Sequence, residues 1–130
     1  MSPLVIAAAI VAGALGAVVR YATTRIVARR LPADKLTRAV LIVNVTGSAL
    51  AGVLLAVPGD LQYILVGGLA GGLTTFSTWT VETMQESLAG RSQAAVGNVV
   101  INLAAGLICG VLAYAITVGV IVAISGGVPA

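Results

Sequence analysis

Four long apolar runs constrain the fold of this chain more than any other feature of its sequence. They cover about residues 4–26, 39–57, 61–83 and 94–124. A helix needs about 20 apolar residues to cross the roughly 30 Å of hydrocarbon in a bilayer, so each run can span a membrane. We therefore expect an all-α integral membrane protein with four transmembrane helices, which form a single membrane domain over residues 1–130.

The composition places the chain in the same class. Hydrophobic residues make up 59% of the sequence and charged residues only 8%, and the mean hydropathy is +1.12. A soluble domain carries far more charge on its surface. The charged residues flank the apolar runs and are not interleaved with aromatic residues, so the net charge of +3 does not indicate a protein that binds nucleic acid.

Several other classes are excluded by residues that the sequence lacks. It contains no histidine and one cysteine, Cys109, which excludes a His/Cys metal site and an internal disulfide. It offers no nucleophile–base pair and no paired carboxylates within the apolar runs, so we do not expect an enzyme. A cleavable signal peptide is not expected either, because Arg20 follows the first apolar stretch and no basic segment precedes it.

The third run has a composition that disfavours a continuous helix. Glycine fills four of the six positions from Gly67 to Gly72, and the segment 73–80 that follows is rich in threonine. Each glycine costs a helix about 1 kcal/mol relative to alanine, and β-branched threonine is also disfavoured. We expect this helix to be broken near the middle of the membrane, where freed backbone groups can meet an ion. Two alternatives stay open: a kinked helix whose hydroxyl groups bond their own backbone, and glycines that serve only close helix packing.

Polar side chains inside the other runs are typical of a pathway for an anion. Asn44 and Ser48 share one helical face of the second run, and Asn98 and Asn102 have the same four-residue spacing in the fourth. Amide and hydroxyl groups donate hydrogen bonds without carrying charge, and aromatic rings add a positive edge. Such donors suit a small, strongly hydrated anion and suit proton-coupled cation transport poorly. The alternative is that these groups only bond neighbouring helices to one another.

Three motifs carry a resemblance to a known family. The segments Gly13–Tyr21, Asn44–Ser48 and Gly71–Thr78 resemble motifs of the Fluc/CrcB fluoride channels, and Gly-Gly-Leu-Thr-Thr-Phe-Ser-Thr is the most specific string. The resemblance covers essentially the whole chain. It implies a fluoride-selective channel that exports fluoride passively across a bacterial or archaeal inner (cell) membrane and so reduces fluoride toxicity.

The resemblance also implies how the protein assembles. It implies an antiparallel, dual-topology dimer with two fluoride pores and a structural Na⁺ ion between the subunits. The backbone carbonyl groups of Gly71 and Thr74 from each subunit would hold the sodium ion. Hard carbonyl oxygens are the ligands that such a cation prefers.

The fluoride pathway implied by the resemblance includes residues of all four runs. Asn44 corresponds to the pore asparagine, Phe76 to the first pore phenylalanine and Glu82 to the acidic residue beyond the aromatic pair. The full set is Arg20, Asn44, Thr75, Phe76, Ser77, Thr78, Trp79, Glu82 and Asn102. Two departures alter the expected pathway: Trp79 stands where the family has a second phenylalanine, and residues 106–110 lack the family's serine and threonine.

Two competing interpretations come from other functional classes. A small multidrug transporter is also a four-span, dual-topology dimer, but it needs a carboxylate deep in the first span, and residues 4–19 contain none. A structural, holin-like membrane protein without selectivity would not need the buried amides or the clustered threonines.

The basic residues are distributed unevenly between the two ends of the predicted bundle. With four spans, both termini and the turn at Pro58 lie on one side of the membrane. Most basic residues fall on the other side, namely Arg25, Arg29, Arg30, Lys35, Arg38 and Arg91. An excess of Lys and Arg favours the cytoplasmic side, so this bias favours one orientation. An inverted homodimer is the main prediction, and a heterodimer with a related chain of opposite bias is the alternative.

Overall fold

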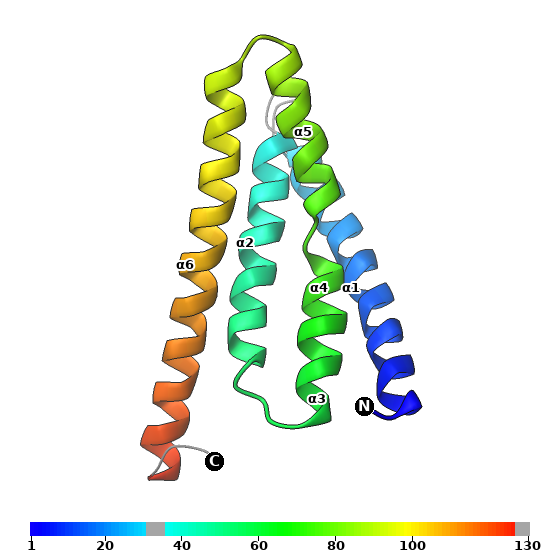
Figure 1. Cartoon of the computed structure of the whole chain (residues 1–130), viewed down its shortest axis with the longest axis vertical. Helices are drawn as coiled ribbons and strands as arrows, with labels where there is room; N and C mark the ends of the chain where they lie inside the picture. The colour runs from blue at the N-terminus through cyan, green and yellow to red at the C-terminus, as the bar shows by residue number, and fades with distance from the viewer. Residues whose placement is uncertain (31–35, 127–130) are drawn as a thin grey trace.

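Helices make up the described part of the chain (Figure 1). The computed structural model describes residues 1–30 and 36–126, in which no strand occurs. In chain order the elements are α1 (Pro3–Arg30), α2 (Leu36–Leu54), α3 (Asp60–Gln62), the π-helix η2 (Tyr63–Ala70), α4 (Gly71–Leu73), α5 (Phe76–Leu88) and α6 (Ser92–Ser125). The elements α3 to α5 together form the predicted third span.

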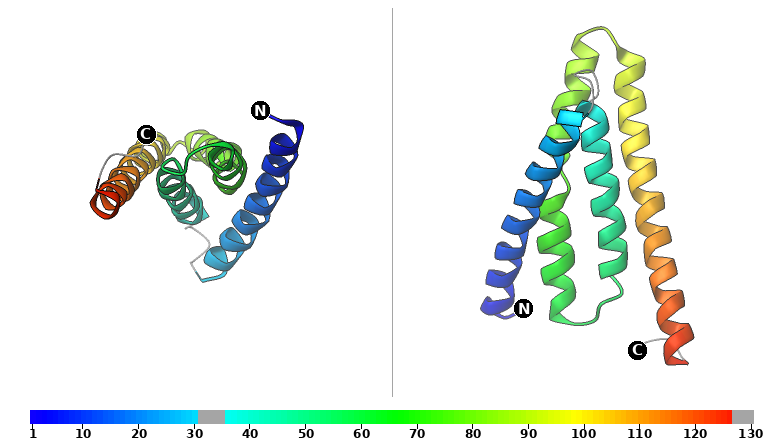
Figure 2. Two further views of the ribbon diagram at one scale, coloured as in Figure 1. Left: turned by 90° about the horizontal axis from the view of Figure 1, so that it is seen from below. Right: turned by 180° about the vertical axis from the view of Figure 1, so that it is seen from behind.

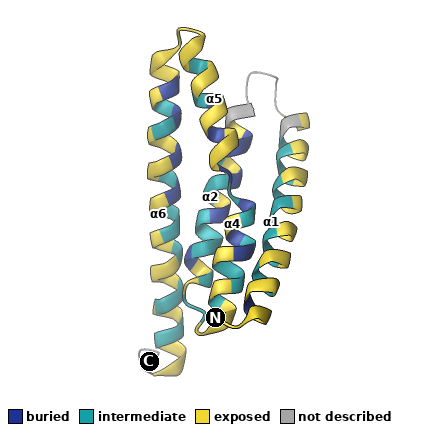
Figure 3. Cartoon of the chain, turned by 45° about the vertical axis from the view of Figure 1, so that its right-hand side comes forward, coloured by how far each residue is buried: buried dark blue, intermediate teal, exposed yellow. Residues whose placement is uncertain are grey.

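Three helical stretches are long and apolar enough to cross a membrane, namely Pro3–Val27, Asp60–Leu88 and Ser92–Ser125. The apolar part of α2, Arg38–Leu54, is shorter. Few apolar side chains are buried, and many large ones are exposed along α1 and α6 (Figure 3). Such an apolar surface requires lipid or another protein chain around it. The structure thus confirms the prediction of an all-helical, multi-pass membrane protein.

The observed helices differ from the predicted runs mainly at their ends. α1 continues to Arg30, past the predicted end near residue 26. α2 begins at Leu36 and ends at Leu54, earlier than the predicted end near residue 57. The early end has a local cause, because a proline disfavours helical backbone in the residue before it, and Pro58 and a left-handed Gly59 (φ 75°) form the turn that follows.

α2 and the third span form the centre of the bundle, between α1 and α6 (Figures 1 and 2). α1 packs mainly on η2 and α4, whereas α6 packs mainly on α2 and also contacts α5. The N-terminus, the turn at Pro58 and the last turn of α6 lie at one end, which we call the terminal end. The last turn of α1 and the turn at Gly90 lie at the other, which we call the basic end.

Glycines of the third span let α1 approach very closely. A Cβ atom added to Gly72 would overlap the carbonyl group of Gly13, and one added to Gly68 would overlap the carbonyl oxygen of Ala9. The same holds for Gly16 of α1, whose added Cβ would overlap the backbone of the third span. These glycines are therefore packing residues, and they lie within helical segments.

The third span is broken at two threonines that follow the glycines. Thr74 has ψ 158° and Thr75 has φ −139° and ψ 116°, both extended backbone, and helix resumes at Phe76. The break divides the span into halves of nearly equal length, Asp60–Leu73 and Phe76–Leu88. The predicted break is therefore present, but the β-branched pair forms it and the glycine run does not.

We expect Gly72→Val to destabilise the bundle, because its side chain would meet the backbone of Gly13. Overpacking of this kind costs about 1–3 kcal/mol or more. The free energy of unfolding, measured by sodium dodecyl sulfate titration in mixed micelles, should fall by at least that amount. Gly119→Ala is the control, because no atom lies within 4 Å of its added Cβ. Equal stability of the two variants would contradict the close approach of α1.

Candidate anion site at the helix break

The side chain of Asn44 replaces the helical hydrogen bonds that Thr75 has lost. The backbone N–H of Thr75 donates to Asn44 Oδ1 at 2.8 Å, and Asn44 Nδ2 donates to the carbonyl oxygen of Thr75 at 3.2 Å. The amide thus bonds both backbone groups of one residue, as a neighbouring peptide would. Backbone groups need such partners in an apolar interior, so Asn44 stabilises the extended conformation of Thr75.

Arg20 bonds the other extended residue. Its Nη1 donates to the carbonyl oxygen of Thr74 at 2.9 Å. This oxygen lies just past the C-terminal end of α4, where a positive charge interacts favourably with the helix dipole. Arg20 therefore contacts the break from the α1 side, and it does not line the cavity described below.

Thr75 also begins the second half of the span. Its Oγ1 accepts a hydrogen bond from the backbone N–H of Thr78 at 3.2 Å, which makes it the N-cap of α5. The N–H groups of Phe76 and Ser77 have no partner within α5, because the first turn of a helix offers none. The N-terminal end of a helix also carries a partial positive charge, so this end of α5 attracts anions.

A chain of hydrogen bonds continues from Asn44 along α6 and α5. Asn44 Nδ2 donates to Asn102 Oδ1 at 3.2 Å, and Asn102 Nδ2 donates to Asn98 Oδ1 at 2.8 Å. Asn98 Nδ2 then donates to Thr83 Oγ1 at 2.9 Å, and that hydroxyl donates to the carbonyl oxygen of Trp79 at 2.9 Å. We call these four side chains, Asn44, Asn102, Asn98 and Thr83, the amide relay.

The amide relay changes the expected role of its asparagines. Both N–H groups of Asn44 are bonded within the chain, to Thr75 and Asn102, and Asn102 Nδ2 bonds both oxygens of Asn98. In this conformation the amides hold neighbouring elements together. From the sequence, Asn98 was noted as a polar residue within the fourth run, but the predicted pathway included neither Asn98 nor Thr83. The four-residue spacing of Asn98 and Asn102 was the signal that could have found Asn98, whereas Thr83 had none.

A cavity of about 240 Å³ lies beside the break, and we call it the inner cavity. Its lining residues come from α2, the break, α5 and α6, and they are Asn44, Ser48, Thr74, Thr75, Phe76, Trp79, Asn102 and Leu103. Among the described residues, no ionisable side chain lines it. The cavity therefore offers neutral donors beside the positive end of a helix, which suits an anion that must lose its water.

The structure brings together only part of the predicted pathway. Phe76 is exposed and packs edge-on against the buried Trp79, with ring centroids 5.2 Å apart, and both line the inner cavity. The indole N–H of Trp79 is 3.4 Å from the carbonyl oxygen of Asn98. Ser77 and Thr78 are exposed and lie within hydrogen-bonding reach of Thr75, outside the cavity lining.

Glu82 lies further along α5 than the cavity. It is 7% exposed, and neither carboxylate oxygen has a hydrogen-bond partner among the described residues. A buried carboxyl group without partners is costly, so this position needs a partner from outside the chain or a function. Its assignment to the pathway stays a prediction.

The predicted sodium ligands lie next to the break. The carbonyl oxygen of Gly71 accepts a hydrogen bond from the Thr74 hydroxyl at 3.3 Å. The carbonyl oxygen of Thr74 accepts a hydrogen bond from Arg20. A Cβ added to the exposed Gly71 would meet only the Val66 carbonyl oxygen, at 3.6 Å, so its outer side is open. Among the described residues no group of three or more His, Cys, Asp or Glu could hold a metal. Carbonyl oxygens suit a hard cation, but two of them leave most of its coordination to other ligands.

The fold and the site together define an all-helical, multi-pass membrane protein whose broken helix lies beside a small cavity lined by uncharged polar and apolar side chains of the described residues. Comparison with known sequences identifies the family. The model of the CrcB-like protein, Camphor Resistance (CrcB), matches residues 7–123, and the chain belongs to this family.

Curated relatives carry names that describe an ion channel. The chain is 39% identical over 102 residues to the fluoride-specific ion channel FluC 2 of Mycobacterium tuberculosis (strain ATCC 25618 / H37Rv), a match that covers 77% of this chain and 80% of that protein. It is 38% identical over 112 residues to the fluoride-specific ion channel FluC of Anaeromyxobacter sp. (strain K), covering 81% of this chain and 86% of that protein. The fluoride-specific ion channel FluC 1 of Nocardia farcinica (strain IFM 10152) is 39% identical over 102 residues, a match that covers 77% of this chain and 71% of that protein.

We expect Asn44→Asp to destabilise the break. The new carboxylate oxygen would face the Thr75 carbonyl and Asn102 Oδ1, two acceptors that Nδ2 now bonds. Each unsatisfied group costs about 1–3 kcal/mol, so the free energy of unfolding in mixed micelles should fall by about 2–5 kcal/mol.

Thr46→Val is the matched control for this variant. Thr46 is exposed on the same helix, and its hydroxyl makes no described hydrogen bond, so its replacement should leave stability within about 0.5 kcal/mol. If Asn44→Asp were as stable as Thr46→Val, Asn44 would not stabilise the break.

Proposed function

We propose that this protein is a fluoride-selective ion channel that lets fluoride leave the cell passively and so reduces fluoride toxicity. The observation that carries the proposal is the inner cavity, which is lined by uncharged residues and by Phe76, the first residue of α5. Relatives named fluoride-specific ion channels support it. A channel needs no nucleophile or general base, and the protein is accordingly not an enzyme.

Fluoride binds water so strongly that only close donors can replace its hydration shell. In the proposed mechanism the backbone N–H groups of Phe76 and Ser77 supply such donors, because the hydroxyl groups of Thr74 and Thr75 already donate to Gly71 and Thr78. The ring edges of Phe76 and Trp79 add weaker positive contacts. The amide relay contributes by holding these groups in place, because its own N–H groups are already bonded. None of the described residues that line the cavity is ionisable, so none of them can couple fluoride to protons.

The working unit in this proposal is a dimer of two oppositely oriented chains. In each chain α1, α2, the third span and α6 all cross the membrane. Gly67 and Gly71 support the dimer, because both are exposed and no side chain of the described residues lies within 4 Å of a Cβ added to either. A second copy packed there would enclose the exposed Phe76 and Thr78. It would also place two sets of carbonyls, from Gly71 and Thr74, around one Na⁺ ion.

The proposed sodium ion would have a structural role. Each chain would offer the Gly71 carbonyl, on the open side of α4, and the second lone pair of the Thr74 carbonyl. Arg20 bonds the same Thr74 oxygen, so its guanidinium group would hold that carbonyl in position from the opposite side.

The distribution of basic residues favours a second possibility for the dimer. Exposed basic residues at the basic end are Arg25, Arg29, Arg30, Arg38 and Arg91, whereas Lys35 lies outside the described residues. This one-sided charge favours insertion with the basic end in the cytoplasm. The family relationship favours an inverted homodimer in a bacterial or archaeal inner membrane, and the charge favours a heterodimer with a chain of opposite bias.

Purified protein in liposomes loaded with potassium fluoride tests the function. Fluoride efflux, followed with a fluoride electrode, should begin only when valinomycin lets potassium leave, because passive anion flow is electrogenic. Efflux from liposomes loaded with potassium chloride should stay at background. Similar rates for the two anions would contradict selectivity.

The same assay separates the two dimers. Flux from the purified chain alone supports the homodimer. If the chain is inactive alone and gains flux when reconstituted with a family member whose charge bias is opposite, the heterodimer is correct. Absence of fluoride flux in both preparations would contradict the proposed function.

A further inference from the structure

A second, larger cavity opens next to the inner cavity. It has a volume of about 530 Å³ and lies between α2 and α6, toward the terminal end of the bundle. We call it the outer groove. Its lining includes Ser48 and Gly52 from α2, Leu55 from the turn that follows α2, and Gly106, Gly110 and Tyr114 from α6. It shares Ser48, Asn102 and Leu103 with the inner cavity, so the two spaces adjoin at these residues.

Ser48 differs from four other hydroxyl residues inside the helices. The hydroxyls of Thr80, Thr83, Thr117 and Ser125 each donate to the carbonyl oxygen four residues earlier in their own helix. A hydrogen bond of this kind to the helix backbone is usual for a hydroxyl group in an apolar helix. The hydroxyl of Ser48 makes no such bond and has no hydrogen-bond partner among the described residues. It is half-buried at the junction of the two cavities, so its donor is free in a place that an ion can reach.

Two glycines of α6 keep space open around this hydroxyl. A Cβ added to Gly106 would lie 3.2 Å from Ser48 Oγ, and one added to Gly110 would lie 3.2 Å from the Ser48 carbonyl oxygen. Both contacts are tighter than ordinary van der Waals contact. A side chain at Gly106 would therefore push against the hydroxyl and narrow the junction.

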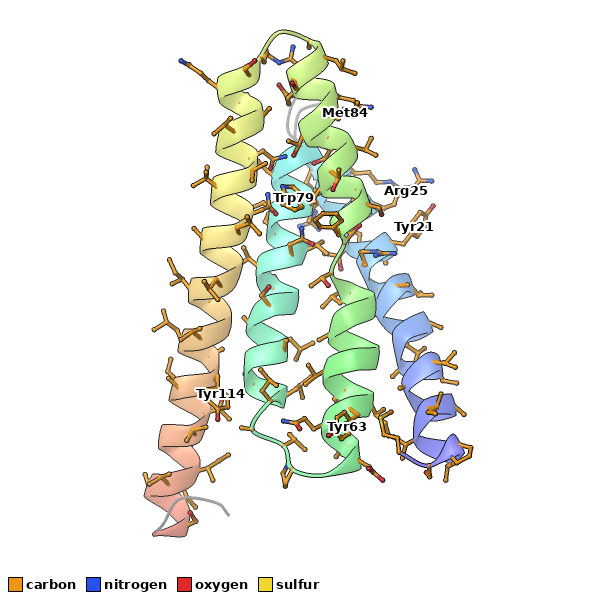
Figure 4. The ribbon with its side chains drawn as sticks, in the orientation of Figure 1. Tyr21, Arg25, Tyr63, Trp79, Met84 and Tyr114 are labelled. Atoms are coloured by element: carbon orange, nitrogen blue, oxygen red, sulfur yellow. The ribbon has the colours of Figure 1, made fainter. Side chains whose placement is uncertain are left out.

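Apart from the Tyr114 hydroxyl, the rest of the outer groove is mainly apolar. The other side chains on its walls include Leu55, Leu107 and Val111, and Tyr114 lies on α6 toward the terminal end (Figure 4). Asn102 reaches the groove, but both of its N–H groups are bonded to Asn98. Ser48 is thus the one uncommitted donor between the groove and the break among the residues that line both cavities. It lies one helical turn from Asn44, on the same face of α2.

We infer that Ser48 is an anion-binding residue at the inner mouth of the outer groove. It would donate a hydrogen bond to fluoride as the ion leaves the groove and before it reaches the donors at the start of α5. Gly106 would provide the room that the ion needs beside the hydroxyl. This inference rests on the proposed function and adds to it one specific route, from the terminal end through the groove between α2 and α6.

Fluoride efflux from liposomes tests this role with Ser48→Ala. Loss of a hydrogen bond to a charged ion should lower the efflux rate roughly 10- to 100-fold. Thr117→Val is the matched control, because it removes a hydroxyl of α6 that lines neither cavity, and it should conduct like the wild type. Gly106→Ala should also slow efflux, by a smaller factor. Ser48→Ala at the wild-type rate would overturn the inference while leaving the proposed function intact.

A chemical measurement covers the case in which Ser48→Ala alters the fold. In a Cys109→Ala background, Ser48→Cys should react with a small water-soluble methanethiosulfonate reagent, and the reaction should block fluoride efflux. Cys109→Ala with no added cysteine should conduct before and after the same treatment. Modification of Ser48→Cys without loss of efflux would overturn the inference. A wild-type protein that conducts no fluoride would overturn the proposed function and this role with it.

Discussion

A membrane interior offers no water to backbone groups that lack partners, so the two hydrogen bonds between the Asn44 side chain and Thr75 support everything around them. They allow the third span to be extended at Thr74 and Thr75 without unbonded groups at Thr75. Once the helix is broken, the N-terminal end of α5 faces a cavity instead of continuing the helix. The candidate anion site is therefore a consequence of one amide that replaces a stretch of helical hydrogen bonding.

The elements around the break hold the Asn44 side chain and its hydrogen-bond partners in position. The glycine contacts between α1 and the third span bring α1 close enough for Arg20 to reach the Thr74 carbonyl. On the opposite side, Asn102 and Asn98 connect Asn44 to α5 through Thr83. The break is thus bonded from α1, from α2 and, through the amide relay, from α6. A rigid set of donors suits fluoride, because flexible donors would lose more freedom on binding a small ion.

Much of this arrangement follows from the sequence, and the rest depends on three-dimensional contacts. Run length and composition predicted the helical membrane fold, and the threonine-rich segment predicted a broken third helix. The glycines and the threonines both favoured the break, but only the threonines form it, because propensity treats glycine as helix-weakening, whereas close contact between Gly72 and Gly13 makes the glycines part of a packed helix. Periodicity places Asn44 on a helix face but not its rotation toward Thr75, 31 residues away in the sequence. The bonded state of its amide could not be predicted for the same reason.

Solid-state NMR of the labelled protein in lipid bilayers tests the central claim that the helix break at Thr74 and Thr75 binds fluoride. The ¹³C shifts of Thr74 and Thr75 should be those of extended backbone between helical Leu73 and Phe76. Addition of fluoride should move the amide resonances of Phe76 and Ser77, and the same concentration of chloride should not. Helical shifts at both threonines, or amide resonances at the start of α5 that do not respond to fluoride, would contradict the account.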